Sequence, residues 1–305
     1  MSDWPLIAVR FGVYLALGGL FGLSAFGYSG LRMGERDNAL ALRGWLIACG
    51  IAGLLLSACW LVLLASSMAG EPPWPVDRAS IDALLSAGAI GTAWKIRMIA
   101  LLLATLAATQ NKSLPFVVLA SSVALAMLAW TGHGSVDEGP IGWLHLGADI
   151  LHLVASAAWV GALLGLVMLV MRPLARVDSE HLDLTHRALH GFGTIGTIVV
   201  ATLVVTGLVN SWLMVGVANV PGLPTTLYGQ LLIAKLVLFT AMIALAALNR
   251  FRLTPYFEKS IANADHRGAL TALRRSLALE TALVVGILGL VAWLGTLAPP
   301  ASLVL

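Results

Sequence analysis

The sequence predicts an all-α integral membrane protein with about eight transmembrane helices in one bundle. Two observations lead to this fold class: only 11% of the 305 residues are charged while 59% are hydrophobic, and the mean hydropathy is +0.92. Soluble domains carry about 25% charged residues. The chain is therefore expected to form a single polytopic membrane domain over residues 1–305, which is better counted in spans than in soluble domains.

Eight apolar runs approach the length of roughly 20 residues that a membrane helix requires. The third run is the shortest, and the fifth is long enough to tilt or to extend beyond the bilayer. Between the second and third runs, helical spacing of Ile81, Leu84 and Leu85 predicts a short interfacial helix. In chain order, the runs are Leu6–Gly30, Trp45–Ala69, Trp94–Thr109, Leu114–Thr131, Ile141–Met171, Gly191–Val215, Leu227–Leu248 and Leu277–Leu297.

Basic residues assign the two sides of the membrane. Connections rich in Arg and Lys alternate with connections that hold one such residue or none, and the positive-inside rule places the rich ones in the cytoplasm. Both termini are then expected to be periplasmic. The net charge of +3 is small, and the basic residues lie at the span ends. The expected partner is therefore the lipid bilayer and not nucleic acid. The basic residues of the rich connections include Arg32, Arg36, Arg43, Lys112, Arg172, Arg176, Arg187, Arg250, Arg252, Lys259, Arg267, Arg274 and Arg275.

Matched spacings suggest a parallel internal repeat of four helices followed by four, with halves near 1–132 and 133–305. Chance spacing also explains so few matches, so the repeat is a hypothesis. Small-residue pairs at Gly18/Gly22 and Gly161/Gly165 are interpreted as helix packing. The matches are Arg10 to Gly19 with His152 to Gly161, nine residues apart, and Gly91 to Arg97 with Gly229 to Lys235, six apart.

A histidine and aspartate pattern opens the fifth run, at the predicted periplasmic face. His145, Asp149 and His152 follow i, i+4, i+7 spacing, which places them on one helix face. His133 ends the preceding run. Imidazole and carboxylate groups are metal ligands, and ionisable groups within a membrane are costly and usually functional. These four residues are therefore the candidate metal ligands.

Lys235 lies in the seventh run at a depth similar to that of Asp149. A buried lysine needs an anion, so an Asp149–Lys235 ion pair is expected, and this pairing competes with Asp149 as a metal ligand. Secondary candidates are Asn210, which is near the outer end of the sixth run, Met214, whose thioether suits Cu(I), and Glu280 in the eighth run. For Glu280 an arginine partner is expected.

Other polar residues have ordinary interpretations. Arg10 and Arg97 enter their spans from outside and are expected to extend back to that surface. The cysteines Cys49 and Cys59 indicate neither a disulfide nor a metal motif. No nucleotide-binding or hydrolase motif is present, so the chain is not expected to be an enzyme. A solvated cytoplasmic loop is expected around His181, His186 and His190.

These residues resemble the CopD/PcoD copper-resistance proteins of the bacterial inner membrane. The resemblance covers about Gly91 to Pro299 and is weaker before that. It rests on the order and spacing of Thr131-Gly132-His133, Asp149-x-x-His152 with Ala155-Ser156-x-x-Trp159-x-Gly161, Tyr228-Gly229 with Lys235, Asn249-Arg250 with Pro255, and Arg274-Arg275 with Glu280.

The resemblance implies an eight-helix inner-membrane protein that handles copper ions as a substrate. It implies copper movement from the periplasm toward the cytoplasm, with His133, Asp149 and His152 as ligands and a periplasmic copper-binding protein of the CopC type as partner. The chain departs from the family in two ways. It carries no fused copper-binding domain, so the donor is expected to be a separate protein. It also reads His190-Gly191-Phe192-Gly193 where many relatives have Arg-Phe-Ser, so no role is carried over there.

Two other functions fit the residues. A b-type membrane cytochrome would use His152 as an axial ligand but needs a second histidine at matching depth. A non-transporting copper chaperone or assembly factor would use the same outer site without a path inward. The sequence does not separate this last reading from transport, and it fixes neither the oligomeric state nor the oxidation state of the copper.

Overall fold

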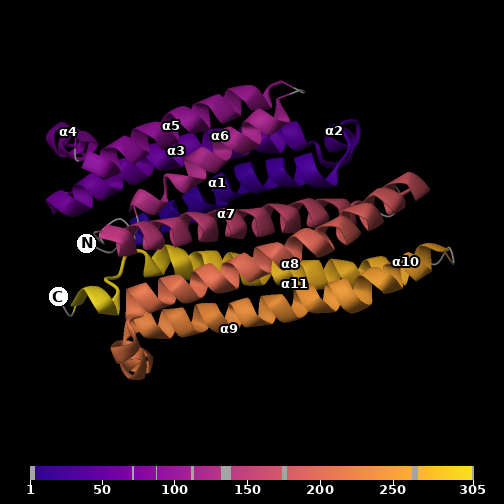
Figure 1. Ribbon diagram of the computed structural model, residues 1–305. Helices are drawn as coiled ribbons and strands as arrows, with labels where there is room; N and C mark the ends of the chain where they lie inside the picture. The colour runs from indigo at the N-terminus through magenta and orange to yellow at the C-terminus, as the bar shows by residue number, and fades with distance from the viewer. Residues whose placement is uncertain are drawn as a thin grey trace.

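The computed structural model describes residues 4–70, 72–86, 88–110, 113–131, 139–173, 177–262 and 267–303. In this part of the chain, eight helices are long and apolar enough to cross a membrane, which confirms the predicted fold class. The helices lie alongside one another in one bundle, and both chain ends lie at the same end of it (Figure 1). Helices are the expected solution because lipid offers no hydrogen-bond partners to the backbone.

The long helices fall into two groups that follow chain order. In Figure 1 the first group occupies one side of the bundle and the second group the other, with α1 and α7 adjacent where the groups meet. The first group is α1 (Trp4–Gly30), α3 (Leu42–Ala69), α5 (Gly88–Ala108) and α6 (Leu114–Ala126), which η1 (Ala129–Thr131) follows. The second group is α7 (Gly139–Val170), α8 (Ser179–Val215), α9 (Leu227–Leu248) and α11 (Arg267–Leu294).

Short elements connect the long helices. The expected interfacial helix is α4 (Arg78–Ser86), which packs on α5. A 3₁₀ segment, η4 (Val217–Thr225), lies between α8 and α9. After α9 the chain continues through a π-helical turn, η5 (Asn249–Leu253), into α10 (Thr254–Ala262). The remaining short elements are α2 (Glu35–Leu40) and η6 (Pro300–Leu303).

Three long helices begin about two turns or more before the predicted apolar runs. The third begins at Gly88 instead of Trp94, the sixth at Ser179 instead of Gly191, and the eighth at Arg267 instead of Leu277. The hydropathy signal marks only the part of a helix that lipid surrounds, whereas the helix itself extends to its cap. For α8 that cap is Asp178, whose side chain accepts a 2.8 Å hydrogen bond from the His181 N–H.

The closest approach between the two groups is a backbone contact between α1 and α7. A methyl group built on Gly22 would lie 2.6 Å from the Cα of Gly161, and one built on Gly161 would lie 1.9 Å from the carbonyl carbon of Gly22. Only glycine fits both positions. One turn further, the Phe26 ring fills the space over Gly165. The small-residue pairs therefore serve helix packing, as predicted.

The two groups share part of their contact pattern. In the first, α1 packs on α3 and α6, and α5 packs on α6. In the second, α7 packs on α8 and α11, and α9 packs on α11. The groups differ in the packing of their middle helices. In the first group α3 packs directly on α5, whereas in the second α8 contacts η4, η5 and α10, which flank α9, more than α9 itself. The pattern fits the four-plus-four hypothesis, which remains a prediction.

Polar contacts join the elements at the end of the bundle that holds α2 and α10. Arg274 of α11 donates hydrogen bonds to the carbonyl of Val170 at 2.8 Å and to that of Arg172 at 2.7 Å, so it caps α7. Arg187 of α8 pairs with Glu35 of α2 at 2.6 Å. This ion pair links the second group of helices to the first.

Candidate functional site

The polar face of α7 meets a polar stripe on α8. Nδ1 of His152 lies 2.9 Å from Oγ1 of Thr206, and Nδ2 of Asn210 donates a 2.7 Å hydrogen bond to Oδ1 of Asp149. Three of these four side chains are half-buried, while Thr206 is fully buried. The predicted face of α7 thus points toward a neighbouring helix, and Asn210 joins the cluster as expected.

The hydrogen bonds around Thr206 favour one tautomer of the His152 ring. The Thr206 hydroxyl has one hydrogen, and it donates that hydrogen to the Thr202 carbonyl at 2.6 Å. With its hydrogen placed there, the hydroxyl accepts from His152, which is the arrangement in which Nδ1 carries the proton and Nε2 keeps its lone pair. A neutral imidazole oriented in this way is the form that binds a metal ion.

The register of the two helices extends the cluster toward the outer end. In an antiparallel pair of helices, residue numbers rise along one helix where they fall along the other, so each turn of one lies beside a turn of the other. His152 faces Thr206 and Asp149 faces Asn210, so the next turn brings His145 level with Met214. His145 is buried, with 2% of its surface exposed. The Tyr228 hydroxyl of α9 donates to Sδ of Met214 at 3.6 Å.

Asp149 lies at the electrostatic centre of this cluster. It is within electrostatic reach of His145 and of Lys235 on α9, and Tyr228 lies within reach of Asp149 in turn. In the part of the chain that the structure describes, the short polar contact of Asp149 is the one to Asn210. The Asp149–Lys235 ion pair therefore stays a prediction, now as an interaction across a longer distance.

Among the described residues, no three His, Cys, Asp or Glu side chains form a group that could hold a metal ion. The reason lies in the helix geometry. Residues seven apart are separated by about 10 Å along the axis, so His145 and His152 cannot converge on one ion from a single helix. His133 lies outside the described residues. Within the described residues, the α7 stripe therefore offers successive positions along the helix.

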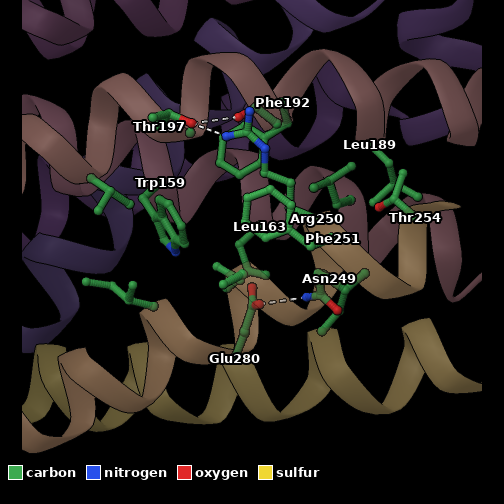
Figure 2. A pocket seen from close by; sticks show the side chains of 18 residues that line it. Trp159, Leu163, Leu189, Phe192, Thr197, Asn249, Arg250, Phe251, Thr254 and Glu280 are labelled. Atoms are coloured by element: carbon green, nitrogen blue, oxygen red, sulfur yellow. Dashed lines mark hydrogen bonds between the residues drawn. The ribbon is translucent and has the colours of Figure 1, made fainter.

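Glu280 belongs to a different place, a cavity toward the other end of the second group (Figure 2). It is 4% exposed and accepts a 2.7 Å hydrogen bond from Nδ2 of Asn249, at the π-helical turn. The expected partners were Arg250 and Arg275; Arg250 instead donates to Thr197 of α8, and the hydrogen bond that Glu280 accepts comes from Asn249. The cavity has a volume of about 290 Å³ and is mostly apolar.

Two further expectations are wrong. Arg97 does not extend to the surface, because only 1% of its area is exposed and its guanidinium lies 5.0 Å from the Trp60 ring. His181 does not belong to a solvated loop. It is buried in the first turn of α8, where Nε2 lies 2.9 Å from the Leu169 carbonyl and Nδ1 lies 3.1 Å from Arg172. Both residues are held by packing that hydropathy does not report.

Sequence reasoning missed Thr206, and it named Tyr228 only as part of a motif. A signal for Thr206 is present in the sequence: Thr206, Asn210 and Met214 follow i, i+4, i+8 spacing on α8, which is one helix face. That stripe advances by about one helical turn per step, as the α7 stripe does. Two such stripes on consecutive antiparallel helices indicate a shared interface.

Comparisons with known proteins agree with this architecture. Two family models match, one described as "Copper resistance protein D-like, N-terminal domain" over residues 1–143 and one as "Copper resistance protein D" over residues 186–294. A protein from Pseudomonas syringae pv. tomato named "Copper resistance protein D" is 42% identical, and the match covers 98% of each chain. The chain belongs to the copper resistance protein D family.

Two more distant relatives extend the family match. "Inner membrane protein YebZ" of Escherichia coli strain K12 is 25% identical over 71% of this chain and 65% of its own. "Copper transport protein CutJ" of Bacillus subtilis strain 168 is 30% identical over 40% of this chain and 21% of its own. No solved structure matches. The copper resistance protein D family and the eight spans together identify a multi-pass protein of the inner membrane that is related to copper resistance and transport.

Proposed function

We propose that this chain moves copper ions from the periplasm toward the cytoplasm, with copper as its substrate and with both termini in the periplasm. The observation that carries the proposal is the pairing of two polar stripes, His145, Asp149 and His152 on α7 with Thr206, Asn210 and Met214 on α8. Polar side chains buried between membrane helices are costly. Two matched rows of them, level by level, indicate a path and not an isolated hydrogen bond.

The residues define the order of the path. His133 and His145 receive copper at the outer end, where Met214 adds a thioether at the level of His145. Imidazole and thioether together suit Cu(I). Asp149 follows one turn deeper and His152 another turn deeper, with the Nε2 lone pair of His152 available to the ion. Because single levels offer few ligands, copper is held loosely enough to move on to the next level.

Copper is delivered by a periplasmic copper-binding protein of the CopC type, since both termini and the outer end of α7 face that compartment in the proposed topology. No catalytic step is part of the proposal, so no enzymatic activity is proposed. Movement is driven by the copper gradient or by a coupled ion. Lys235 is not a ligand in this proposal: its positive charge, within electrostatic reach of Asp149, repels the cation from α9.

The proposal is tested by uptake of radioactive copper into proteoliposomes that contain the purified protein. Wild-type protein should accumulate copper inside the vesicles, and His152→Ala should abolish uptake. His190→Ala is the matched control, because His190 is an exposed histidine on the part of α8 that lies beyond the apolar run. Equal uptake by wild type and His152→Ala would refute the path.

The same preparation separates the alternatives. Copper binding by the wild type without uptake would show a chaperone or assembly factor, since both functions share the outer site. A Soret absorption band in the purified protein would show a b-type cytochrome. In the described chain, the histidines other than His145 and His152 are His181, His186 and His190, all in the first turns of α8 and distant from the level of His152.

A further inference from the structure

The first group of helices holds a second polar cavity, away from the α7–α8 stripes. Arg97 of α5 and Arg10 of α1 line it together with Tyr14 and Trp60, and Thr131 of η1 also takes part. Arg97 is 1% exposed, which makes it the largest of the fully buried side chains. The volume of the cavity is about 10 Å³, which is room for one water-sized species.

The guanidinium groups at this cavity have unused donors. Nε and Nη2 of Arg97, and Nε of Arg10, are buried and have no hydrogen-bond partner in the described part of the chain. Nη2 of Arg10 donates to the Tyr14 hydroxyl at 3.3 Å. Since that hydroxyl accepts from Arg10, its own hydrogen remains for another acceptor. Buried donors without acceptors are uncommon in native proteins.

The cavity also lacks a negative charge. Neither Asp nor Glu is present among its lining residues in the described chain. The Trp60 ring, whose centroid is 5.0 Å from Cζ of Arg97, offsets part of the cost of burying a cation, but it adds no countercharge. Two arginines that share a small cavity inside a membrane bundle repel each other unless an anion lies between them.

We propose that this cavity binds a small inorganic anion of the size of chloride. The donor set consists of N–H and O–H groups only, which is the chemistry that an anion requires. The volume admits one water-sized ion and excludes tetrahedral oxyanions such as sulfate. The site is independent of the proposed copper path, because its described residues belong to α1, α3, α5, η1 and the turn before η1, and not to α7 or α8.

The four-plus-four hypothesis gives the site a counterpart. The matched spacings align Arg10 with His152 and Arg97 with Lys235. If the halves are repeats, one half carries a cation site at the position where the other carries an anion site. The anion would then offset the positive charges of Arg10 and Arg97 in the first half, just as Asp149 is expected to offset that of Lys235 in the second.

Thermal unfolding of the purified full-length protein in detergent tests the proposal. The buffer contains gluconate as the large reference anion, and chloride or bromide replaces it at constant ionic strength. Chloride and bromide should raise the wild-type melting temperature in a saturable way, by about 5 °C at one hundred times the dissociation constant. Sulfate should not. A wild-type melting temperature that does not distinguish halide from gluconate would overturn the proposal.

Variants locate the response. Arg97→Met should lose the halide-dependent shift, and Tyr14→Phe, which keeps the ring and removes one donor, should weaken halide affinity several-fold. The matched control is Arg187→Gln, which removes an arginine outside the cavity and should keep the full shift, as should His152→Ala. If Arg97→Met does not fold, the halide-dependent shift of the melting temperature in Tyr14→Phe tests the assignment alone. A shift that is unchanged in Tyr14→Phe, or that survives in folded Arg97→Met, would contradict the assignment.

Discussion

Thr206 of α8 holds the imidazole of His152 on α7 through a 2.9 Å contact to Nδ1, while its own hydrogen goes to the Thr202 carbonyl at 2.6 Å. One hydroxyl therefore orients a histidine on another helix and favours the tautomer with the proton on Nδ1. This kind of support is what metal-binding histidines usually have behind them. It ties the proposed ligand to a residue that cannot itself bind copper well.

Thr206→Val is expected to lower copper affinity by about 10- to 100-fold. Valine keeps the size of the side chain but offers no acceptor, so the Nδ1 proton of His152 loses its partner and the ring loses its orientation. Competition titration with a copper chelator measures the effect. Thr240→Val is the control, because Thr240 is exposed and its hydroxyl donates only to the Leu236 carbonyl of its own helix. An unchanged affinity in Thr206→Val would mean that His152 does not bind copper.

Neutralising Asp149 and Lys235 is expected to give non-additive effects on copper uptake. Each of Asp149→Asn and Lys235→Met leaves the other charge without its counterpart in a low-dielectric site. The double variant removes both charges, so it should be less impaired than the sum of the single variants. A double-mutant cycle on uptake and on thermal stability measures the coupling. Strict additivity in both measurements would show that the two residues do not interact.

The Glu35–Arg187 ion pair is expected to make stability depend on pH at the α2 end. Burial raises the pKa of Glu35, but hydrogen bonds from the Arg32 N–H and from Arg187, with the charge of the latter, outweigh it and hold the pKa below its ordinary value. The stability from this pair is therefore present above the unfolded-state pKa and is lost as the pH falls through the folded-state pKa.

Glu35→Gln removes this pH dependence. The expected loss at pH 7 is only about 0.5 kcal/mol, since the Arg187 side chain is 41% exposed and solvent screens the pair. The difference from the wild type should shrink as the pH is lowered into the acid range. Melting curves of both proteins across that range measure it, and a gap that widens toward acid pH would have the wrong sign for a depressed pKa.

The predicted topology can be tested by labelling with a membrane-impermeant maleimide. In a background with Cys49→Ala and Cys59→Ala, Thr225→Cys should react in intact spheroplasts, whereas Lys259→Cys should react only after lysis. Both positions are exposed in the structure, whereas Ser260 next to the second one is buried and would give a false negative. Labelling of position 259 in intact spheroplasts would contradict the predicted topology.

The number and order of the membrane helices could be predicted because the bilayer imposes a length and a composition on each of them. For α9 the predicted bounds, Leu227–Leu248, are those of the structure. The ends of α8 and α11 could not be found in the same way. Their first turns carry charged residues outside the apolar run, where hydropathy no longer distinguishes a helix from a loop.

The candidate site was predictable on one helix only. The i, i+4, i+7 spacing places His145, Asp149 and His152 on one face whatever surrounds α7. Which helix that face meets depends on how α8 is rotated and on the antiparallel register, and hydropathy carries neither. For the same reason Arg97 was expected at the surface: its depth could be counted along the helix, but its direction could not.

The Gly22–Gly161 contact has a mechanical consequence. At this point the two backbones touch with no side chain between them. Larger side chains next to the contact, such as Phe26 against Gly165, interlock and oppose sliding of the helices. The contact therefore favours tilting of the two groups of helices about this point over sliding along it. A tilt that opens one end of the bundle would then close the other end, with the Gly22–Gly161 contact as the pivot.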